Sequence, residues 1–518
     1  MVVETFAAGG LEWGNSSLWS QFCELADLDG AALAVVDAEG RHWARAELVT
    51  LAMRYRMALQ QHQVGPGDRV MIEACKKVET LAAMLAISSL GAICCPYGST
   101  LSDTDRSVLE TRLGHVLRLS WKKSESSVGE VDRIYISLPP RGLARSDDVR
   151  DSLTALIGFT SGTTGVPKGV MHGPAALNYA TRACARNAGL QPDEPLLAIV
   201  PWDSAPGYTF TVHFSLSLGH PLVIVDPWNA VAALELAATY RCGWAICVPT
   251  HLFMMMEAAR NGSWSGKLAF RAMAVGGSAM TPELIADADR LLGICALRMF
   301  GMSECMGHAS TLPQDSLERR LHSDGRSFPG TQDIAFDSEL RPLGVGVRGQ
   351  AGVRGPSLFL GYCKDLGDGT ARMTADGFFL TGDEITRDAD GYIKVVGRIK
   401  DQIIRGGFNI DPAEIEGALV RHVAISEAAV VPLPHPKLGE QACAVCVIRE
   451  GCEAPSLAMV TDHLANLGLS KKKWPEHLVF IAAMPVNANG KVDKKLLTQL
   501  VRQPGAEIMT NAEKRPTD

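Results

Sequence analysis

The sequence lacks the features that would direct it to a membrane, to secretion or to nucleic acid. It begins "MVVETFAAGGLEWGN", with no basic segment before an apolar core, so we expect no secretory signal. Its longest apolar stretch, residues 81–95, contains serines and a glycine and falls short of the roughly 18 residues that a membrane span needs. The 50 basic and 57 acidic residues give a net charge of -7, with no long basic run for nucleic acid. We therefore expect a cytoplasmic protein without a membrane span.

The sequence also lacks a pattern of cysteines that would suggest disulfides or a metal centre. Its 13 cysteines are odd in number and lie mostly within apolar segments, which is typical of reduced core residues. Cys443 and Cys446 form a single CxxC inside the apolar segment "ACAVCVI", and no second ligand pair is evident. We interpret this segment as a buried strand.

The chain is long enough for more than one core, and its pattern is that of an α/β protein. A chain of 518 residues exceeds the size at which single cores stop growing. In the first 150 residues, and again from residue 151, apolar strands alternate with helical patterns, which predicts α/β layers. Strand candidates at 221–225, 244–249 and 268–277 predict that one parallel sheet continues. Beyond about residue 330, glycines and short β-like runs predict a smaller β-rich subdomain.

A charged, glycine-containing segment at 397–411, "GRIKDQIIRGGFNID", predicts a joint between domains. We expect a large N-terminal domain over residues 1–399 and a small α+β domain, the lid domain, over residues 400–505. The polar residues 506–518 are expected to be a frayed tail. The lid begins with a helix for which Asp411, Pro412 and Glu414 predict a capping box.

The stretch "TSGTTGVPKG" at 160–169 has the composition of a phosphate-binding loop. Its glycines allow backbone N–H groups to approach an anion, its serine and threonines supply hydroxyls, and Lys168 supplies a positive charge. The spacing fits neither the Walker pattern nor the dinucleotide fingerprint. A flexible surface loop is the alternative interpretation of this stretch taken alone.

This loop resembles the signature loop of the adenylate-forming (ANL) superfamily, which includes acyl- and aryl-CoA synthetases, peptide-synthetase adenylation domains and luciferases. "RMFGMSE" at 298–304 resembles the family's aromatic-Gly-x-Thr-Glu element, and "FFLTGD" at 378–383 resembles its TGD element. The segment at 397–416 is similar to the family's hinge, and "PVNANGK" at 485–491 is similar to the element that carries its catalytic lysine. The resemblance covers nearly the whole chain.

The resemblance implies a stand-alone acid–CoA ligase that uses ATP, Mg²⁺ and coenzyme A. A carboxylate cannot lose hydroxide readily, so ATP converts it to an acyl-AMP whose AMP leaves readily. Bringing the carboxylate to the α-phosphate sets like charges together, which requires cations and aimed donors. No nucleic acid is implied. The oligomeric state stays open, a homodimer included.

The resemblance assigns roles to individual residues. Lys491, Glu304 and Lys168 are the expected catalytic residues, and Glu304 is the expected Mg²⁺ ligand, with Thr164 as a second candidate. Asp383 and Arg398 are expected at the ribose, and Phe300, where the family usually has tyrosine, at the adenine. A plain Asx-turn for Asp383 and a core aromatic for Phe300 are the alternatives. The residues expected to bind ATP or AMP are Thr160, Ser161, Gly162, Thr163, Thr164, Gly165, Lys168, Gly276, Gly277, Ser278, Phe300, Gly301, Ser303, Asp383 and Arg398.

The C-terminal lid is expected to serve both half-reactions. The resemblance implies that Lys491 swings in to bridge the substrate carboxylate and the α-phosphate. Lys400 matches the position of the family's pivot, and a solvated linker lysine is the alternative. Gly406 and Gly407 are expected to let the pantetheine chain of CoA pass close to the backbone.

The identity of the acid is the least determined feature. Residues of the stretch "PWDSAPGY", together with Val248, Met302 and Met306, are the candidate walls of an acid pocket and favour a hydrophobic acid. In this stretch, Ser204 stands where many CoA ligases have histidine, and Asp203 keeps open an amine-bearing substrate. The pocket candidates are Trp202, Ser204, Gly207, Val248, Met302 and Met306. Transfer to a carrier protein or an amine, and a nucleotide-binding pseudoenzyme that acts as an interaction partner, are the alternatives.

Overall fold

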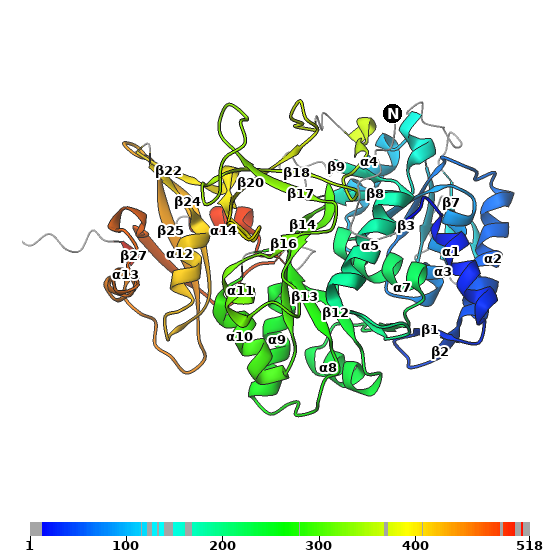
Figure 1. The fold of residues 1–518 in the computed structure, drawn as a ribbon, viewed down its shortest axis with the longest axis horizontal. Helices are drawn as coiled ribbons and strands as arrows, with labels where there is room; N and C mark the ends of the chain where they lie inside the picture. Colours follow the sequence, from blue (N-terminus) through cyan, green and yellow to red (C-terminus); the bar gives the residue numbers. More distant parts are fainter. Residues whose placement is uncertain are drawn as a thin grey trace, which may run out of the picture. The chain divides into compact units, whose positions relative to one another are not determined.

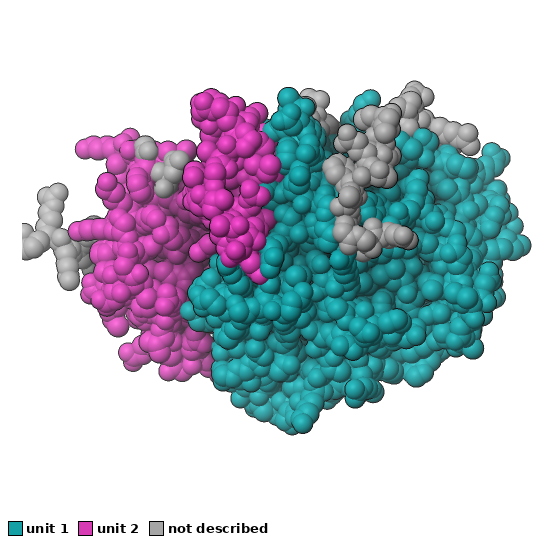
Figure 2. Space-filling model, in the orientation of Figure 1, with its two compact units in different colours: residues 1–277, 282–333, 353–379 teal, residues 278–281, 334–352, 380–518 magenta. Residues whose placement is uncertain are grey.

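The computed structural model describes residues 13–114, 116–121, 127–131, 134–138, 149–160, 168–278, 280–366, 371–406, 408–486, 491–502 and 509–510. The chain divides into two compact units, which Figure 2 colours separately. The larger unit contains residues 1–277, 282–333 and 353–379, and the smaller unit contains residues 278–281, 334–352 and 380–518. The α/β multidomain class predicted from the sequence is confirmed. The domain bounds predicted at residues 399/400 and 505/506 stay predictions.

The larger unit contains a nine-stranded sheet in which six neighbouring strands are parallel, in the order β14-β13-β12-β10-β11-β1. Figure 1 labels β14, β13, β12 and β1 of these strands. Strands β15, β16 and β2 extend it in antiparallel fashion. The carboxyl ends of parallel strands share one edge of a sheet, which is where open α/β sheets bind their ligands. The strands are β1 (Leu33–Val36), β2 (His42–Ala44), β10 (Leu196–Ala198), β11 (Leu222–Ile224), β12 (Trp244–Cys247), β13 (Ala272–Gly276), β14 (Ala296–Met302), β15 (Cys305–Ser310) and β16 (Arg326–Ser327).

A second, eight-stranded sheet of the larger unit has the order β19-β9-β8-β4-β3-β5-β7-β6, so the predicted single continuous parallel sheet is wrong. Strands β3, β4, β5 and β8 are parallel, but β9 turns back antiparallel to β8 and is bordered by β19. The chain then enters helix α5 (Pro174–Ala188) and continues in the other sheet. The strands are β3 (Arg69–Glu73), β4 (Ile93–Tyr97), β5 (Leu117–Ser120), β6 (Ser127–Val131), β7 (Ile134–Ser137), β8 (Leu156–Thr160), β9 (Lys168–His172) and β19 (Gly361–Tyr362).

Helices pack against these sheets because their apolar positions recur at helical spacing. Helix α5 begins at Pro174, which has the fixed φ that a first helical position requires, and is followed by the left-handed Gly189. Helix α9 (Pro249–Arg260) buries Leu252 and Met255, as expected for a core helix. The other helices are α1 (Leu18–Leu28), α2 (Arg45–Gln61), α3 (Val78–Ser89), α4 (Asp103–Arg112), α6 (Ala205–Gly207), α7 (Phe214–Leu218), α8 (Ala230–Thr239), α10 (Pro282–Leu292) and α11 (Leu317–His322), with the 3₁₀ helices η1 (Val149–Leu153) and η3 (Lys364–Leu366) and the π-helix η2 (Tyr208–His213).

Two buried histidines, His172 and His213, and the partly buried His251 should make the larger unit sensitive to acid. Burial lowers the pKa of His172 and His251 to about 4 and that of His213 to about 3. Histidine in an unfolded chain has a pKa near 6.5, so between these values the unfolded state binds protons that the native state refuses. The free energy of unfolding therefore has its full value above about pH 6.5 and decreases as the pH falls below that value. At pH 5 each group costs on the order of 2 kcal/mol.

We expect the thermal unfolding midpoint of the protein to be lower at pH 5.0 than at pH 7.5. Calorimetry at the two pH values measures the difference. The variant His322→Asn, which changes a half-exposed histidine of helix α11, should keep the same pH dependence as the natural protein. Equal midpoints at the two pH values would contradict the prediction.

The smaller unit is built on two sheets. One has the order β17-β18-β20-β21, with β20 and β21 pairing as a hairpin. The other is centred on β25, which pairs with β22, β24 and β26. The strands are β17 (Gln332–Phe336), β18 (Gly349–Arg354), β20 (Phe379–Arg387), β21 (Ile393–Arg398), β22 (Ile403–Arg405), β23 (Phe408–Ile410), β24 (Ile425–His435), β25 (Gly439–Ile448), β26 (His477–Ile481) and β27 (Met509–Thr510), with helices α12 (Pro412–Leu419), α13 (Leu457–Asn466) and α14 (Lys494–Arg502) and turns η4 (Ile399–Asp401) and η5 (Lys471–Lys473).

Strand β25 is buried on both faces, because successive side chains of a strand point in opposite directions. Ala444 and Cys446 face a cluster that includes residues of α12 and α13, whereas Cys443 and Val445 face α14 through Leu497. Cys443 and Cys446 are free and buried, so the interpretation of this CxxC as a buried strand is confirmed.

The start of α12 differs from the predicted capping box. Asp411 is the N-cap and accepts a hydrogen bond from the Ala413 N–H, and Pro412 is the first helical residue, as predicted. Glu414 instead accepts hydrogen bonds from Lys473 Nζ at 2.6 and 2.8 Å. The Lys473 ammonium therefore binds the Glu414 carboxylate that a capping box would direct to the N-cap backbone.

The helices in the described part of the chain are too short or too polar to span a membrane.

Candidate active site

Glu304 lies in a tight hairpin turn at the end of the parallel strand β14. Met302 of β14 pairs with Cys305 of β15, so Ser303 and Glu304 form the turn between them. The Glu304 carbonyl accepts a hydrogen bond from the Phe359 N–H at 2.9 Å. Its carboxylate Oε1 accepts a hydrogen bond from the Tyr362 hydroxyl at 2.6 Å. The predicted metal ligand is thus a half-buried carboxylate held by one phenol.

Lys168 is the first residue of β9, and its cross-strand partner is Thr160 at the end of β8. The two residues therefore hold the two ends of the predicted phosphate loop side by side. Lys168 Nζ lies 4.7 Å from the centre of the Tyr362 ring. The loop residues Ser161, Gly162, Thr163, Thr164 and Gly165 lie outside the described residues.

His172, at the other end of β9, fixes the turn that carries Glu304. Its Nε2 lies 2.7 Å from the Ser303 carbonyl oxygen. A carbonyl only accepts, so Nε2 carries the proton, and burial lowers the histidine pKa to about 4. The neutral imidazole therefore ties strand β9 to the turn. Sequence reasoning missed His172, although its position four residues after Lys168 on a strand was a usable signal.

The other predicted nucleotide residues of the larger unit lie at the ends of β13 and β14. A side chain on Gly276 would meet the Met299 carbonyl oxygen at 2.6 Å, so only glycine allows the two strands to approach there. Gly277 has φ +89° and is exposed, as is Gly301. Phe300 is half-buried, and its ring centre lies 4.2 Å from that of His308.

A buried histidine–aspartate pair supports Phe300 from behind, and sequence reasoning missed it. His308 Nδ1 lies 2.6 Å from Asp333 Oδ1, and the Ser327 hydroxyl donates to Asp333 Oδ2 at 2.7 Å. Both members of the pair are shielded from solvent. His308, Ser327 and Asp333 are well separated in the chain, so no local sequence pattern indicated that they interact.

In the smaller unit, Asp383 and Arg398 form an ion pair because they occupy opposite positions of the β20–β21 hairpin. Arg398 Nε donates to Asp383 Oδ1 at 2.9 Å. The Asp383 side chain is 5% exposed and that of Arg398 is 61% exposed, so the aspartate is oriented while the guanidinium reaches solvent. The roles expected for these two residues at the ribose stay predictions.

Lys491 lies near the same ion pair. Burial, and next the positive charge of Arg398, lower the pKa of the Lys491 ammonium, while the negative charge of Asp383 raises it. Lys491 lies in the chain between β26 and α14, far from the β20–β21 hairpin in sequence, and Leu497 and Val501 anchor α14 in the core. The smaller unit therefore brings together a carboxylate and two cations that the sequence motifs kept far apart.

The remaining predicted residues of the smaller unit are at exposed positions. Lys400 lies exposed in the turn η4. Gly406 has φ +55° in the turn between β22 and β23, where its N–H donates to the Leu438 carbonyl at 2.7 Å. Ser278 is exposed, and Gly407 lies outside the described residues.

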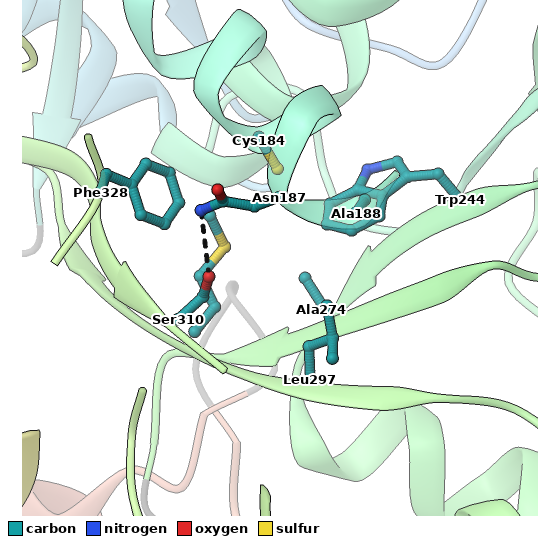
Figure 3. A pocket seen from close by; sticks show the side chains of 9 residues that line it. Cys184, Asn187, Ala188, Trp244, Ala274, Leu297, Ser310 and Phe328 are labelled. Carbon is teal, nitrogen blue, oxygen red and sulfur yellow. Dashed lines mark hydrogen bonds between the residues drawn. The ribbon is translucent and has the colours of Figure 1, made fainter. Parts of the chain in front are cut away.

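The six acid-pocket candidates have different surroundings in the structure. Trp202 and Met306 belong to the main core cluster, and Met302 packs against a different one. Ser204 caps the short α6 by accepting from the Gly207 N–H, Gly207 is buried, and Val248 is 6% exposed. The small cavity shown in Figure 3 lies elsewhere, beneath α5, with Asn187 and Ser310 as its polar wall. The acid-pocket assignment stays a prediction.

The arrangement provides the chemical groups that nucleotide activation of an acid requires. The larger unit presents Lys168 at the start of β9 and Glu304 after the parallel strand β14, both in contact with the Tyr362 side chain, and a glycine edge at the end of β13. The smaller unit presents an oriented carboxylate with two cations. This fold and these motifs define an enzyme of the adenylate-forming superfamily.

The chain belongs to the AMP-binding enzyme family, whose pattern matches residues 24–363, and residues 414–491 match the C-terminal domain of AMP-binding enzymes. It is an enzyme of the AMP-forming acid–thiol ligase class. It is 28% identical to the medium-chain fatty-acid–CoA ligase of Escherichia coli K12 over 94% of this chain and 90% of that protein. It is 29% identical to the indoleacetate–CoA ligase of Aromatoleum aromaticum over 89% and 94%. The crystal structure of ATP-bound MatB from Rhodopseudomonas palustris matches with TM-score 0.80 and 25% identity, covering 94% of this chain and 99% of that one.

Proposed function

We propose that this protein activates a hydrophobic carboxylic acid with ATP and transfers the acyl group to coenzyme A. In the first half-reaction a carboxylate oxygen attacks the α-phosphorus, acyl-AMP forms and pyrophosphate leaves. In the second half-reaction the CoA thiol loses its proton, its sulfur attacks the acyl carbon, and AMP leaves. Family membership supports ATP and CoA as substrates of this class of enzyme.

The observation that carries the proposal is the grouping of Lys491 with Asp383 and Arg398 in one unit. The buried Asp383 carboxylate is held by Arg398, and a carboxylate is the kind of acceptor to which ribose hydroxyls donate. An ammonium beside it then lies near the α-phosphate of the same nucleotide. There it would counter the charge that develops as the carboxylate attacks.

Lys168 and Glu304 supply the complementary charges of the larger unit. Lys168 would bind the phosphates that leave as pyrophosphate, together with the loop at 160–169. Glu304 is a hard oxygen donor, and the Tyr362 hydrogen bond occupies only Oε1, so the donor set fits Mg²⁺. The ion would supply charge neutralisation of the phosphates when bound. The remaining proposed nucleotide contacts are those of the glycine edge at Gly276 and Gly277 and of Phe300.

Two observations support a hydrophobic acid and CoA as the acceptor. The relatives reported above are named for a medium-chain fatty acid and for indoleacetate, which are both largely apolar acids, and both are named CoA ligases. The pocket candidates Trp202, Val248, Met302 and Met306 are apolar as well. We further propose Lys400 as the pivot of the lid, and Gly406 and Gly407 as the path of the pantetheine chain.

Acid-dependent exchange of labelled pyrophosphate into ATP tests the first half-reaction. We expect exchange with at least one member of a panel of medium-chain, aryl and alicyclic acids, and none without acid. The active acid is then incubated with ATP and either CoA, a holo carrier protein or an amine. A thioester with CoA supports the proposal. Product formed only with the carrier protein or only with the amine would show that this compound, and not CoA, is the acceptor. No exchange with any acid would contradict the proposed activity.

A further inference from the structure

Tyr362 contacts both charged groups that the larger unit offers to the nucleotide. Its hydroxyl donates to Glu304 Oε1 at 2.6 Å, which is the short distance of a hydrogen bond to a carboxylate. Lys168 Nζ lies 4.7 Å from the centre of its ring, within cation–π distance. The tyrosine comes from β19, nearly two hundred residues after Lys168 in the chain.

The backbone around Tyr362 is held from several sides, so the position of its ring is fixed. Strand β19 pairs with β9, with Tyr362 opposite Val170. The Tyr362 carbonyl accepts a hydrogen bond from Arg150 Nη2 at 3.0 Å, and its ring meets that of Phe359 edge-on at 5.0 Å. Gly361 has φ +128°, a conformation that side chains rarely allow. The glycine before the tyrosine is therefore part of its placement.

The phenol ring keeps two opposite charges from neutralising each other. Lys168 and Glu304 form no ion pair with each other among the described residues, although both contact one ring. Direct pairing would hold the ammonium away from phosphate and occupy the carboxylate that a metal requires. The Lys168 ammonium keeps its positive charge on the aromatic face. To bind phosphate it loses a cation–π contact, which is weaker than an ion pair with a carboxylate would be.

The Tyr362 hydroxyl donates to one carboxylate oxygen of Glu304, Oε1, and leaves the other oxygen, Oε2, for a metal ion. A carboxylate oxygen only accepts hydrogen bonds, so the Tyr362 hydroxyl is the donor to Glu304 Oε1. A donor on Oε1 restricts rotation of the carboxylate and directs Oε2 away from the phenol.

We infer that Tyr362 is a positioning residue for nucleotide activation, which separates Lys168 from Glu304 and orients Glu304 toward a divalent cation. The inference rests on the proposed function for the roles of these two residues. It assigns separate tasks to the two parts of the side chain: the hydroxyl sets the affinity for the metal, and the ring sets the availability of Lys168.

Two substitutions separate these tasks. Tyr362→Phe keeps the ring and removes the hydroxyl, so we expect the Mg²⁺ concentration at half-maximal pyrophosphate exchange to rise about tenfold, with the KM for ATP at saturating Mg²⁺ within about twofold of the natural value. Tyr362→Leu removes the spacer as well, so we expect the KM for ATP to rise at least about fivefold in addition. Tyr240→Phe is the matched control, because it removes a tyrosine hydroxyl that lies 3.2 Å from His42 on an exposed surface.

Binding of Mn²⁺·ATP, followed by electron paramagnetic resonance of the free Mn²⁺, tests the inference without catalysis. At fixed ATP, Tyr362→Phe should need about tenfold more Mn²⁺ for half-saturation than the natural protein and Tyr240→Phe. If the natural protein shows this binding but no acid supports exchange, the proposed reaction fails while the inference stands. Unchanged metal dependence in Tyr362→Phe, with an unchanged thermal midpoint, overturns the inference. Equal effects of Phe and Leu on the KM for ATP overturn the role of the ring.

Discussion

Replacing Lys491 by alanine should lower the rate of acyl-adenylate formation by about 10²- to 10³-fold, the scale on which one preorganised charge-stabilising group acts. Its ammonium lies in the field of Asp383 and Arg398 and is partly desolvated, so its positive charge is poorly screened. Thioester formation from supplied acyl-adenylate needs no such charge and should stay within about twofold. Lys491→Arg should not restore the first step, because a planar guanidinium does not replace a compact ammonium.

Single-turnover pyrophosphate release measures the first step, and CoA-dependent consumption of synthetic acyl-adenylate measures the second. Lys494→Ala is the matched control, since Lys494 lies three residues further on and pairs with Glu416 at 2.6 Å. That variant should retain both steps. Undiminished pyrophosphate release in Lys491→Ala would remove this lysine from the mechanism and, with it, the observation on which the proposed function depends.

The second large effect is expected for Glu304→Gln. The substitution keeps the length of the side chain and an oxygen that can accept from Tyr362, so the turn between β14 and β15 should remain folded. It removes the negative charge that a divalent cation requires. We expect adenylation to fall about 100-fold at low millimolar Mg²⁺ and to recover partly at higher Mg²⁺ concentrations.

Initial rates of pyrophosphate release across a series of Mg²⁺ concentrations check this expectation. Glu318→Gln is the control, because Glu318 is 79% exposed on α11, and its charge pairs only with His322 on the same helix among the described residues. A rate and a Mg²⁺ dependence equal to those of the natural protein would exclude Glu304 as the metal ligand.

Local patterns predicted the elements that carry the motifs. Helix α14 has its apolar residues at helical spacing, and Leu497 and Val501 are buried on it. The strand β8 before the phosphate loop and the helix α5, with Pro174 as its first residue, agree with the alternation of strands and helices that the sequence predicts from residue 151. These features depend on neighbours within a few residues, so a sequence pattern contains the necessary information.

The division into two sheets could not be predicted in the same way. Strands β8 and β10 have similar apolar patterns, yet β8 pairs with β4 and β10 pairs with β11 and β12. Which buried strand neighbours another is decided by long-range packing, and apolar runs of this kind are nearly interchangeable locally. The expectation of one continuous sheet failed for this reason.

The sequence by itself determined which chemical groups this protein has and in which motifs they stand: the glycine–threonine loop with Lys168, the turn with Glu304, the Thr-Gly-Asp segment with Asp383, and the C-terminal Lys491. Only the tertiary structure decided how these groups are held. The β20–β21 register sets Arg398 against Asp383, and the pairing of β19 with β9 sets Tyr362 between Lys168 and Glu304. Hydrogen bonds and charges act over a few ångströms in space, and no pattern along the chain reports which distant residues the fold brings within that distance.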